Sequence, residues 1–135
     1  MSGMSLIEVL TVMAILAILA AIAWPSYTDV LRKGRRMDAI TALQRVQLDQ
    51  ERYRAVHHRY AQRLSDLGWL ADEVDSSEGY YRIRLQEVAD ARVDYRVRAE
   101  PKSGTDQIND ACGAFALGAQ GADPDAPADA ACWLH

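Results

Sequence analysis

The feature that most constrains this chain is an apolar run close to its N-terminus, from Gly3 to Trp24. From Met4 onward the run is about as long as a helix must be to cross the roughly 30 Å hydrocarbon core of a bilayer. One ionisable side chain, Glu8, interrupts it. An unpaired carboxylate in hydrocarbon costs several kcal/mol, so an acid at this depth is a functional-site hypothesis that requires a cationic partner.

Two ordinary explanations of the apolar run fit less well. A secretory signal could be cleaved at the small residues Ala21-Ile22-Ala23, which would release a soluble periplasmic binding module. However, the three residues before Met4 carry no Lys or Arg, and an acid lies inside the apolar region. A plain single-pass anchor would leave Glu8 without a partner.

The combination of Gly3, a short polar leader, Leu6-Ile7-Glu8, the apolar run and Pro25 resembles the class III signal of type IV prepilins. The resemblance implies that a prepilin peptidase cleaves after Gly3 on the cytoplasmic face and that the new terminus, Met4, is N-methylated. It also implies that the apolar helices assemble into a filament core. Glu8 would there neutralise the terminal amine of a neighbouring subunit.

The sequence departs from the prepilin pattern at two positions. Met4 stands where the family usually has Phe, and Ala17 occupies a position that is often Gly. Because Gly costs about 1 kcal/mol relative to Ala within a helix, Ala17 makes local melting of this segment less favourable. Pro25 keeps a second breaking point, since it lacks a backbone N–H and its ring clashes with the preceding turn.

The charge of the chain is unevenly distributed. Its formal net charge is −4 at pH 7, yet the stretch from Arg32 to Arg63 holds nine Lys or Arg residues against Asp38, Asp49 and Glu51. The remainder from Leu64 onward is acidic. This distribution excludes a protein that is basic throughout, as many nucleic-acid-binding domains are.

The sequence contains no recognisable catalytic or cofactor motif. It has no Gly-rich phosphate loop, no metal-ligand cluster and no nucleophile with an identifiable base. His57 and His58 are adjacent, so on a helix they point about 100° apart and make a poor metal pair. We therefore expect no enzyme, no cofactor and no metal site.

Cys112 and Cys132 are the two cysteines of the chain. An even pair in a translocated domain indicates one disulfide, although a metal pair or two free thiols are alternatives. Only His135 lies near as a further zinc ligand, so a zinc site is disfavoured.

The basic residues that follow the apolar run (Arg32, Lys33, Arg35 and Arg36) favour a cytoplasmic body by the positive-inside rule. We follow the cysteines and the prepilin resemblance, which place the body outside.

Beyond Pro25 the helical pattern continues, which predicts one long helix from about Met4 to about Tyr60. Its apolar stripe comprises Tyr27, Val30, Leu31, Met37, Ile40, Leu43, Val46, Tyr53, Val56 and Tyr60. Charged residues on the opposite face have spacings that favour local ion pairs. The alternative is a basic, aromatic DNA-contacting patch, made by Arg52, Tyr53, Arg54, His57, His58, Arg59, Tyr60 and Arg63.

The rest of the chain reads as a small antiparallel sheet. Residues 61–79 form a connecting loop, with Leu64, Leu67, Trp69 and Leu70 as its core contacts and a turn at 76–79. Alternating residues predict strands over 81–86 and 93–100, whose outer faces set Arg against Asp or Glu. A third strand begins near Cys112. Residues 118–131 have little apolar bulk and would be loose unless Cys132 were tied back.

Several short segments of the C-terminal half resemble the PilE-type minor pilins of Gram-negative bacteria. They are Gln50-Glu51-Arg52-Tyr53, Leu67-Gly68, Gly79-Tyr80-Tyr81, Ala99-Glu100-Pro101, Gly104, Gln107, Asp110-Ala111-Cys112-Gly113 and Cys132-Trp133. The resemblance implies an α+β pilin fold, in which a long N-terminal helix packs on a small antiparallel sheet and a disulfide closes a C-terminal loop.

The same resemblance implies the organisation of the chain. Residues 1–3 would be the leader and 4–25 the transmembrane or filament-core helix, and 26–135 would be a periplasmic globular domain. In that domain, 26–60 would be the second half of the helix, 61–79 the loop, 80–118 the strands and 112–132 the disulfide-bounded loop.

As a function, the resemblance implies a non-catalytic minor pilin that takes part in assembly or initiation of type IV pili, fibres used in adhesion and twitching motility. Its partners would be other major and minor pilins, the prepilin peptidase, the inner-membrane assembly platform and the membrane itself. It would pass from the inner membrane to the extracellular fibre. A major pilin, a type II secretion pseudopilin and a competence pilin that binds nucleic acid are the alternatives.

Overall fold

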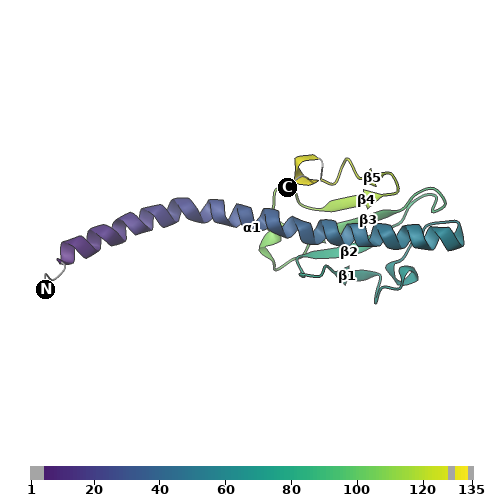
Figure 1. Ribbon diagram of the computed structural model, residues 1–135, viewed down its shortest axis with the longest axis horizontal. Helices are drawn as coiled ribbons and strands as arrows, with labels where there is room; N and C mark the ends of the chain where they lie inside the picture. The colour runs from purple at the N-terminus through teal and green to yellow at the C-terminus, as the bar shows by residue number, and fades with distance from the viewer. Residues whose placement is uncertain (1–4, 128–129, 134–135) are drawn as a thin grey trace.

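The computed structural model describes residues 5–127 and 130–133. One helix, α1 (Leu6–His57), extends far beyond the rest of the chain, which folds against its C-terminal half (Figure 1). The strands are β1 (Glu73–Asp75), β2 (Tyr81–Gln86), β3 (Arg96–Pro101), β4 (Phe115–Gly118) and β5 (Gly121–Ala122). Three single 3₁₀ turns are η1 (Leu64–Leu67), η2 (Asp106–Asn109) and η3 (Ala130–Trp133).

Helix α1 passes through Pro25 without a break and curves gently in its exposed half (Figure 1). Proline often kinks a helix because it lacks a backbone N–H, but the bend in α1 is the gentle curvature that is usual in long helices. The helix ends where His58 adopts a left-handed conformation, with φ of 56°. Its N–H donates to the Arg54 carbonyl at 2.9 Å, which satisfies one of the last free carbonyls of the helix.

The five strands pair in chain order, β1-β2-β3-β4-β5, and every neighbouring pair is antiparallel. Each strand thus lies beside the next one along the chain, as consecutive strands commonly do. The turn between β1 and β2 closes where the Gly79 N–H donates to the Ser76 carbonyl at 2.9 Å. Gly79 there has φ of 77°, a conformation that most side chains disfavour.

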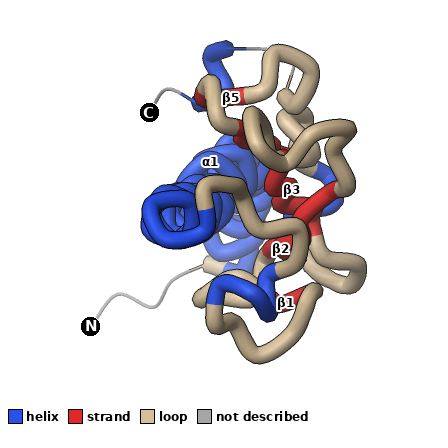
Figure 2. The backbone as a smooth tube through the Cα atoms, turned by 90° about the vertical axis from the view of Figure 1, so that its right-hand side faces the viewer, coloured by secondary structure: helices blue, strands red, loops and turns tan. Residues whose placement is uncertain are grey.

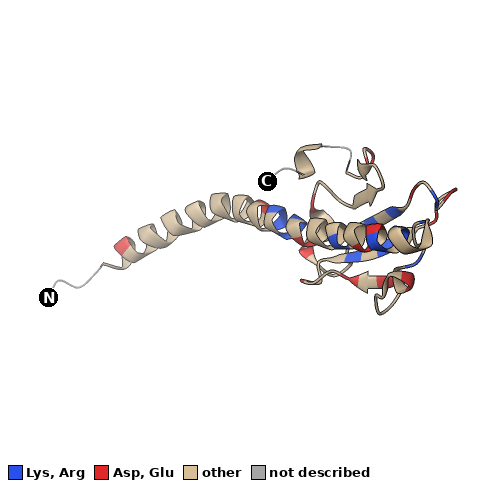
Figure 3. Ribbon diagram, turned by 45° about the vertical axis from the view of Figure 1, so that its right-hand side comes forward, with Lys and Arg blue, Asp and Glu red and all other residues tan. Residues whose placement is uncertain are grey.

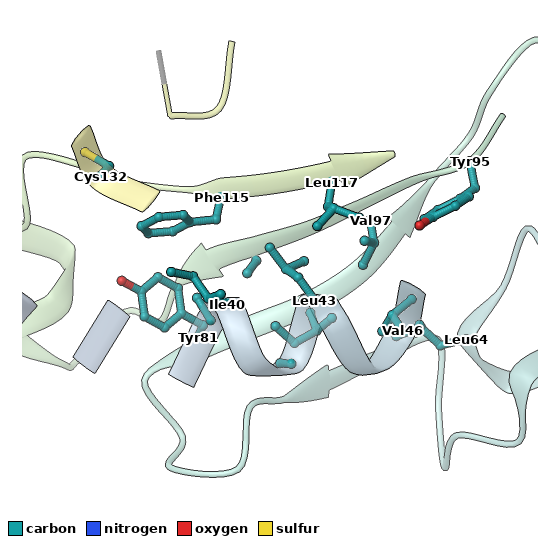
Figure 4. Close-up of a cluster of buried hydrophobic side chains, with 14 of the residues drawn as sticks. Ile40, Leu43, Val46, Leu64, Tyr81, Tyr95, Val97, Phe115, Leu117 and Cys132 are labelled. Atoms are coloured by element: carbon teal, nitrogen blue, oxygen red, sulfur yellow. The ribbon is translucent and has the colours of Figure 1, made fainter. Parts of the chain in front are cut away.

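The core lies between the C-terminal half of α1 and one face of the sheet. In Figure 4, Ile40, Leu43 and Val46 of the helix point toward Tyr81, Val97, Phe115 and Leu117 of the strands. Figure 2 looks along the molecule and shows α1 lying over one side of the strands. Strand alternation places every second side chain on this face, so β2 and β3 supply both the core and an outer polar face.

The Cys112–Cys132 disulfide expected from the sequence is confirmed, with the two Cα atoms 5.9 Å apart. Cys132 is buried within the core cluster (Figure 4). Trp133 packs edge-on against Phe115, with ring centroids 5.1 Å apart. The C-terminal segment is therefore held by a covalent bond and by an aromatic contact with β4. The α+β fold class is confirmed as well.

Several details differ from the sequence-based expectations. The segment 61–79 contains η1 and strand β1, and 118–131 contains β5 and part of η3. The second expected strand begins at Arg96 rather than at Val93, because the Asp94 N–H turns back to the Asp90 carbonyl at 3.2 Å. The expectation that Leu70 is a core contact is wrong, since its side chain is fully exposed.

Candidate functional site

The N-terminal part of α1, from Leu6 to Trp24, is an apolar stem whose residues are all exposed. The helix passes a length and composition test for a membrane span, with a mean hydropathy of 2.7 over its most apolar window, none of which is buried. Trp24 at the end of this stem is 71 % exposed. A continuous apolar surface along a helix of this length is unfavourable in water. A bilayer or the helices of other subunits can bury it.

Glu8 lies in the first turn of the stem and is exposed. Its backbone N–H donates to the Ser5 carbonyl at 3.0 Å, whereas its carboxylate has no hydrogen-bond or ion-pair partner among the described residues. The neighbouring polar residue, Thr11, satisfies its hydroxyl within the helix by donating to the Ile7 carbonyl at 2.7 Å. The predicted cleavage-site residues Gly3 and Met4 lie outside the described residues.

Two arginines fix the point where the stem enters the folded head. The Arg32 guanidinium donates to both carboxylate oxygens of Asp106, at 2.9 and 3.1 Å. One turn later, Arg36 donates to both oxygens of Asp110, at 2.8 and 2.6 Å. Bidentate pairs of this kind are directional, so they orient α1 relative to η2. Two of the four basic residues that follow the stem are therefore committed to holding the fold.

The electrostatics of this junction keep its carboxylates charged. Burial alone would raise the pKa of Asp110, but hydrogen bonds from Arg36 and from the Cys112 N–H outweigh it and hold the pKa below its usual value. The hydrogen bond from Arg32 likewise lowers the pKa of Asp106. Burial raises the pKa of Tyr81, whose hydroxyl lies against this network, to about 12.

The far end of α1 carries the basic and aromatic residues that the sequence singled out as a possible DNA contact. The rings of Tyr53 and His57 stack with centroids 4.0 Å apart. Arg54 donates to the Tyr60 hydroxyl at 2.7 Å, and its guanidinium lies 4.8 Å from the Tyr60 ring centroid. Arg59 is exposed and has no ion-pair partner among the described residues. Tyr60 itself is buried in the core, so the expectation that its ring belongs to an exposed patch is wrong. We call the remaining residues the distal patch: Arg52, Tyr53, Arg54, His57, His58, Arg59 and Arg63.

One of the local ion pairs expected on this face of the helix is present, because Arg52 contacts Asp49 at 3.4 Å. A second pair, which the sequence analysis did not predict, joins Arg63 and Asp66 at 3.0 Å. Both arginines nevertheless keep about two-thirds of their side-chain surface exposed. Exposed pairs of this kind contribute about 0–1 kcal/mol, so an anion could displace the carboxylates at little cost.

The outer face of the sheet carries a second group of arginines, and here the expected pairing with acids is confirmed. Arg84 and Arg98 face each other across β2 and β3, and both donate to one oxygen of Glu100 at 2.9 Å. Arg82 contacts Asp75 at 3.1 Å. Figure 3 shows these charges along the strands. Within the part of the chain that the structure describes, no group of three His, Cys, Asp or Glu side chains could hold a metal ion.

Comparison with known families decides the class of protein. A family model described as "Type IV minor pilin ComP, DNA uptake sequence receptor" matches residues 25–116, which is more than half of the chain. The chain belongs to this family of type IV minor pilins. A second family model, the prokaryotic N-terminal methylation motif, matches residues 1–24 of the pilin. No curated protein matches the chain.

The boundary between the two matches lies at the end of the exposed stem. The methylation motif covers Gly3, Met4, Glu8 and the exposed stem, whereas the minor-pilin match runs from Pro25 through the second half of α1 to β4. The prepilin signal and the apolar helix are consistent with membrane anchoring and pilus assembly. Pilin families are structural and non-enzymatic, in keeping with the lack of catalytic motifs in the sequence.

Proposed function

We propose that this pilin joins type IV pili as a minor subunit and captures DNA at the fibre surface for uptake. The observation that carries the proposal is the match over residues 25–116 to a family described as a DNA uptake sequence receptor. The sequence favoured a role in assembly or initiation of the pilus, with DNA binding as an alternative. Because of the family match, we propose DNA binding as the main function.

The N-terminal features support incorporation into a fibre. In this proposal, residues 1–3 are a leader removed by a prepilin peptidase, 4–25 form the membrane and fibre-core helix, and 26–135 form the periplasmic domain. The subunit resides in the inner membrane before assembly and meets the assembly platform and other pilins there. Pro25 marks the boundary between the stem and the part of α1 that continues into the head.

Processing after Gly3 is the first expected result. Mass spectrometry of the protein extracted from membranes should find a mature chain that begins with N-methylated Met4, because the glycine, Glu8 and the apolar run are in register. A mature chain that begins at Trp24 would instead indicate an ordinary secretory signal, and it would remove the stem on which fibre assembly depends.

The distal patch is the region we propose for DNA contact. It lies at the end of α1 opposite to the stem (Figure 1). His57 is 33 residues beyond Trp24, so α1 carries the patch about 50 Å from the stem. A fibre that buries its stems therefore leaves this end accessible. Exposed guanidinium groups bind backbone phosphates, and the stacked Tyr53 and His57 rings offer an aromatic surface.

Removing two exposed charges from the distal patch tests this assignment. The double variant Arg52→Gln/Arg59→Gln should weaken binding to a short DNA duplex by about tenfold or more, and it should reduce the slope of log K against log salt by about 2. The measurement is fluorescence anisotropy of the labelled duplex with detergent-solubilised full-length pilin over a series of salt concentrations.

A matched control separates a local site from the overall charge of the protein. Arg82→Gln/Arg92→Gln also removes two arginines, one from the outer sheet face and one from the β2–β3 loop, and should leave binding within about twofold of wild type. Equal losses in both double variants would argue against the distal patch.

Fibre counts of the strain that carries Arg52→Gln/Arg59→Gln should stay normal while DNA uptake falls. Fewer fibres would favour the assembly role.

A further inference from the structure

A groove runs beside α1 just beyond the stem. Its walls are the helix and the turn between β1 and β2, and it encloses about 570 Å³. Apolar side chains from the helix form much of one wall, with the Tyr80 ring on the other side. The residues that line the groove are Val30, Leu31, Gly34, Arg35, Met37, Asp38, Thr41, Ser77, Glu78 and Tyr80.

The far wall of the groove is fixed in place by the Asp38 carboxylate. It accepts hydrogen bonds from the Ser76 hydroxyl at 2.5 Å, from the Glu78 N–H at 3.0 Å and from the Tyr80 N–H at 3.3 Å. The Arg35 guanidinium lies 4.6 Å from the Tyr80 ring centroid, at the rim. The groove is therefore a preformed surface rather than a gap that a mobile loop could fill.

The groove continues the exposed apolar surface of the stem. A single helix face, with steps of three and four residues, leads from Val9 through the stem to Tyr27 and on to Val30 and Met37. Val30 is 64 % exposed and Met37 44 % exposed, although both lie beside the folded head. The sequence places these side chains on the core stripe, but nothing in the head covers them.

Gly34 lies on the same helix face, and no contact among the described residues requires a glycine at this position. A glycine inside a helix costs about 1 kcal/mol relative to alanine. A Cβ atom at Gly34 would meet nothing within 4 Å apart from its chain neighbours and the adjacent helix backbone. The space that this glycine leaves open is therefore open to a partner.

We propose that this groove is the docking site for the apolar stem of a neighbouring pilin subunit in the fibre. The inference rests on incorporation into a fibre, which the proposed function already requires. The middle of the stem and the middle of the groove are about 20 residues apart along α1, so this contact joins subunits displaced by about 30 Å along the helix axis. The head of each minor subunit thus takes part in covering the stem of another.

Charge and chemistry favour a stem over other occupants of the groove. Its charged lining residues are Arg35, Asp38 and Glu78, so the lining offers no excess of positive charge to bind a DNA backbone. The stem offers the matching surface, because between Leu6 and Trp24 its only charged residue is Glu8. Small residues such as Gly34 allow a helix to approach another closely.

Filling the groove from the Gly34 position tests the proposal. Gly34→Leu should leave the thermal stability of the detergent-solubilised protein unchanged or higher, because leucine favours the helix and its Cβ atom finds open space. The same variant should lower recovery of the pilin in sheared fibres by about tenfold or more at equal membrane levels. Gly34→Ala should be recovered like wild type; an equal loss for Gly34→Ala would indicate that a flexible helix, and not an open groove, is required.

The matched control is Ala55→Leu, which adds the same kind of side chain to an exposed position about 30 Å further along α1. It should not change recovery in fibres. Normal recovery of Gly34→Leu would overturn the docking site. If wild type itself were missing from fibres, the proposed function would fail, which keeps the two failures distinguishable.

Photo-crosslinking identifies the occupant directly. p-Benzoylphenylalanine placed at position 37 should yield, in fibres, an adduct whose peptide map lies in the apolar N-terminal helix of another pilin. The same probe at position 56, an exposed apolar site in the distal patch region, should not yield that adduct. Adducts from position 37 to a pilin head, to DNA or to lipid would each contradict the proposal.

Discussion

Replacement of Glu8 by leucine should lower recovery of the pilin in sheared fibres by on the order of a hundredfold, while Gly3 cleavage and membrane insertion continue. Removing one partner of a buried ion pair costs about 3–5 kcal/mol, because the other charge is left unpaired. Each 1.4 kcal/mol corresponds to a factor of ten in an equilibrium constant. The loss should therefore appear at the assembly step, where stems leave lipid and pack together.

The composition of the stem explains why one residue has so large an effect. No Lys, Arg or His occurs between Leu6 and Trp24, so the stems themselves offer the Glu8 carboxylate no cation. We propose that the amine of a neighbouring subunit's Met4 is its partner in the fibre. In the bilayer, a carboxylate so close to the end of the helix can remain near the head groups, which reduces the cost of carrying the charge before assembly.

Two further variants make the Glu8 experiment specific. Thr11→Val also removes a polar group from the stem, but this hydroxyl is already satisfied by the Ile7 carbonyl, so recovery should be unchanged. Glu8→Gln keeps the size and loses the charge, and it should behave like Glu8→Leu. Recovery is measured by immunoblot of sheared fibres, normalised to membrane levels. Unchanged recovery of Glu8→Leu would show that this subunit does not depend on the ion pair.

The long helix could be predicted from sequence because its periodicity is strong on both sides of Pro25. The exact composition of its buried face could not. Asp38 and Gln50 are buried although they are polar, since Asp38 accepts three hydrogen bonds and Gln50 exchanges two with the backbone of Ala61, at 2.9 and 2.8 Å. A pattern of apolar residues does not record such partners, which come from distant loops. Val56 shows the converse, because it fits the stripe but is 72 % exposed.

The strands differ in how well the sequence predicts them. β2 and β3 alternate over six residues each, and the sequence predicts both. β1 and β5 have three and two residues, too few for an alternation to be visible, and they form because the neighbouring strands offer free edges. The start of β3 moves to Arg96 because the turn from Asp90 to Asp94 uses Val93 as a turn residue, and this side chain is exposed as a result.

The candidate sites were predictable to different degrees. The sequence alone singles out Glu8, Pro25 and the cysteine pair, because the residue type and its position along the chain are enough to identify each of them. The arginines that hold the junction were less visible. Arg32 and Arg36 look like part of a basic flank, and only the fold brings Asp106 and Asp110 to them, 74 residues away in the chain. The groove was missed since its side chains were assigned to the core.

Loss of the Cys112–Cys132 disulfide should lower the free energy of unfolding of the head by about 3 kcal/mol. The bond closes a loop across a sequence separation of 20, and the chain-entropy model gives about 3 kcal/mol for a loop of this size. Removal of a native disulfide from a small secreted domain typically costs about 2–5 kcal/mol. The variant is Cys112→Ala/Cys132→Ala, measured by urea denaturation of the full-length pilin in detergent.

The structure also predicts where the damage begins. The segment that follows β5 is attached to β4 by two backbone hydrogen bonds: the Ala116 N–H donates to the Ala126 carbonyl at 2.7 Å, and the Asp123 N–H donates to the Ala116 carbonyl at 3.0 Å. Closer to η3, the covalent bond and the Trp133 contact with Phe115 supply the attachment. Without the bond, proteases should cut between residues 119 and 131 before the head unfolds, and they should leave β2 and β3 intact. Wild type treated with a reductant provides the matched control, because it removes the bond without changing a residue. Resistance to cleavage in both samples would show that the hydrogen bonds with Ala116 and the packing of Trp133 on Phe115 hold the segment without the bond, and that the disulfide acts mainly on the unfolded chain.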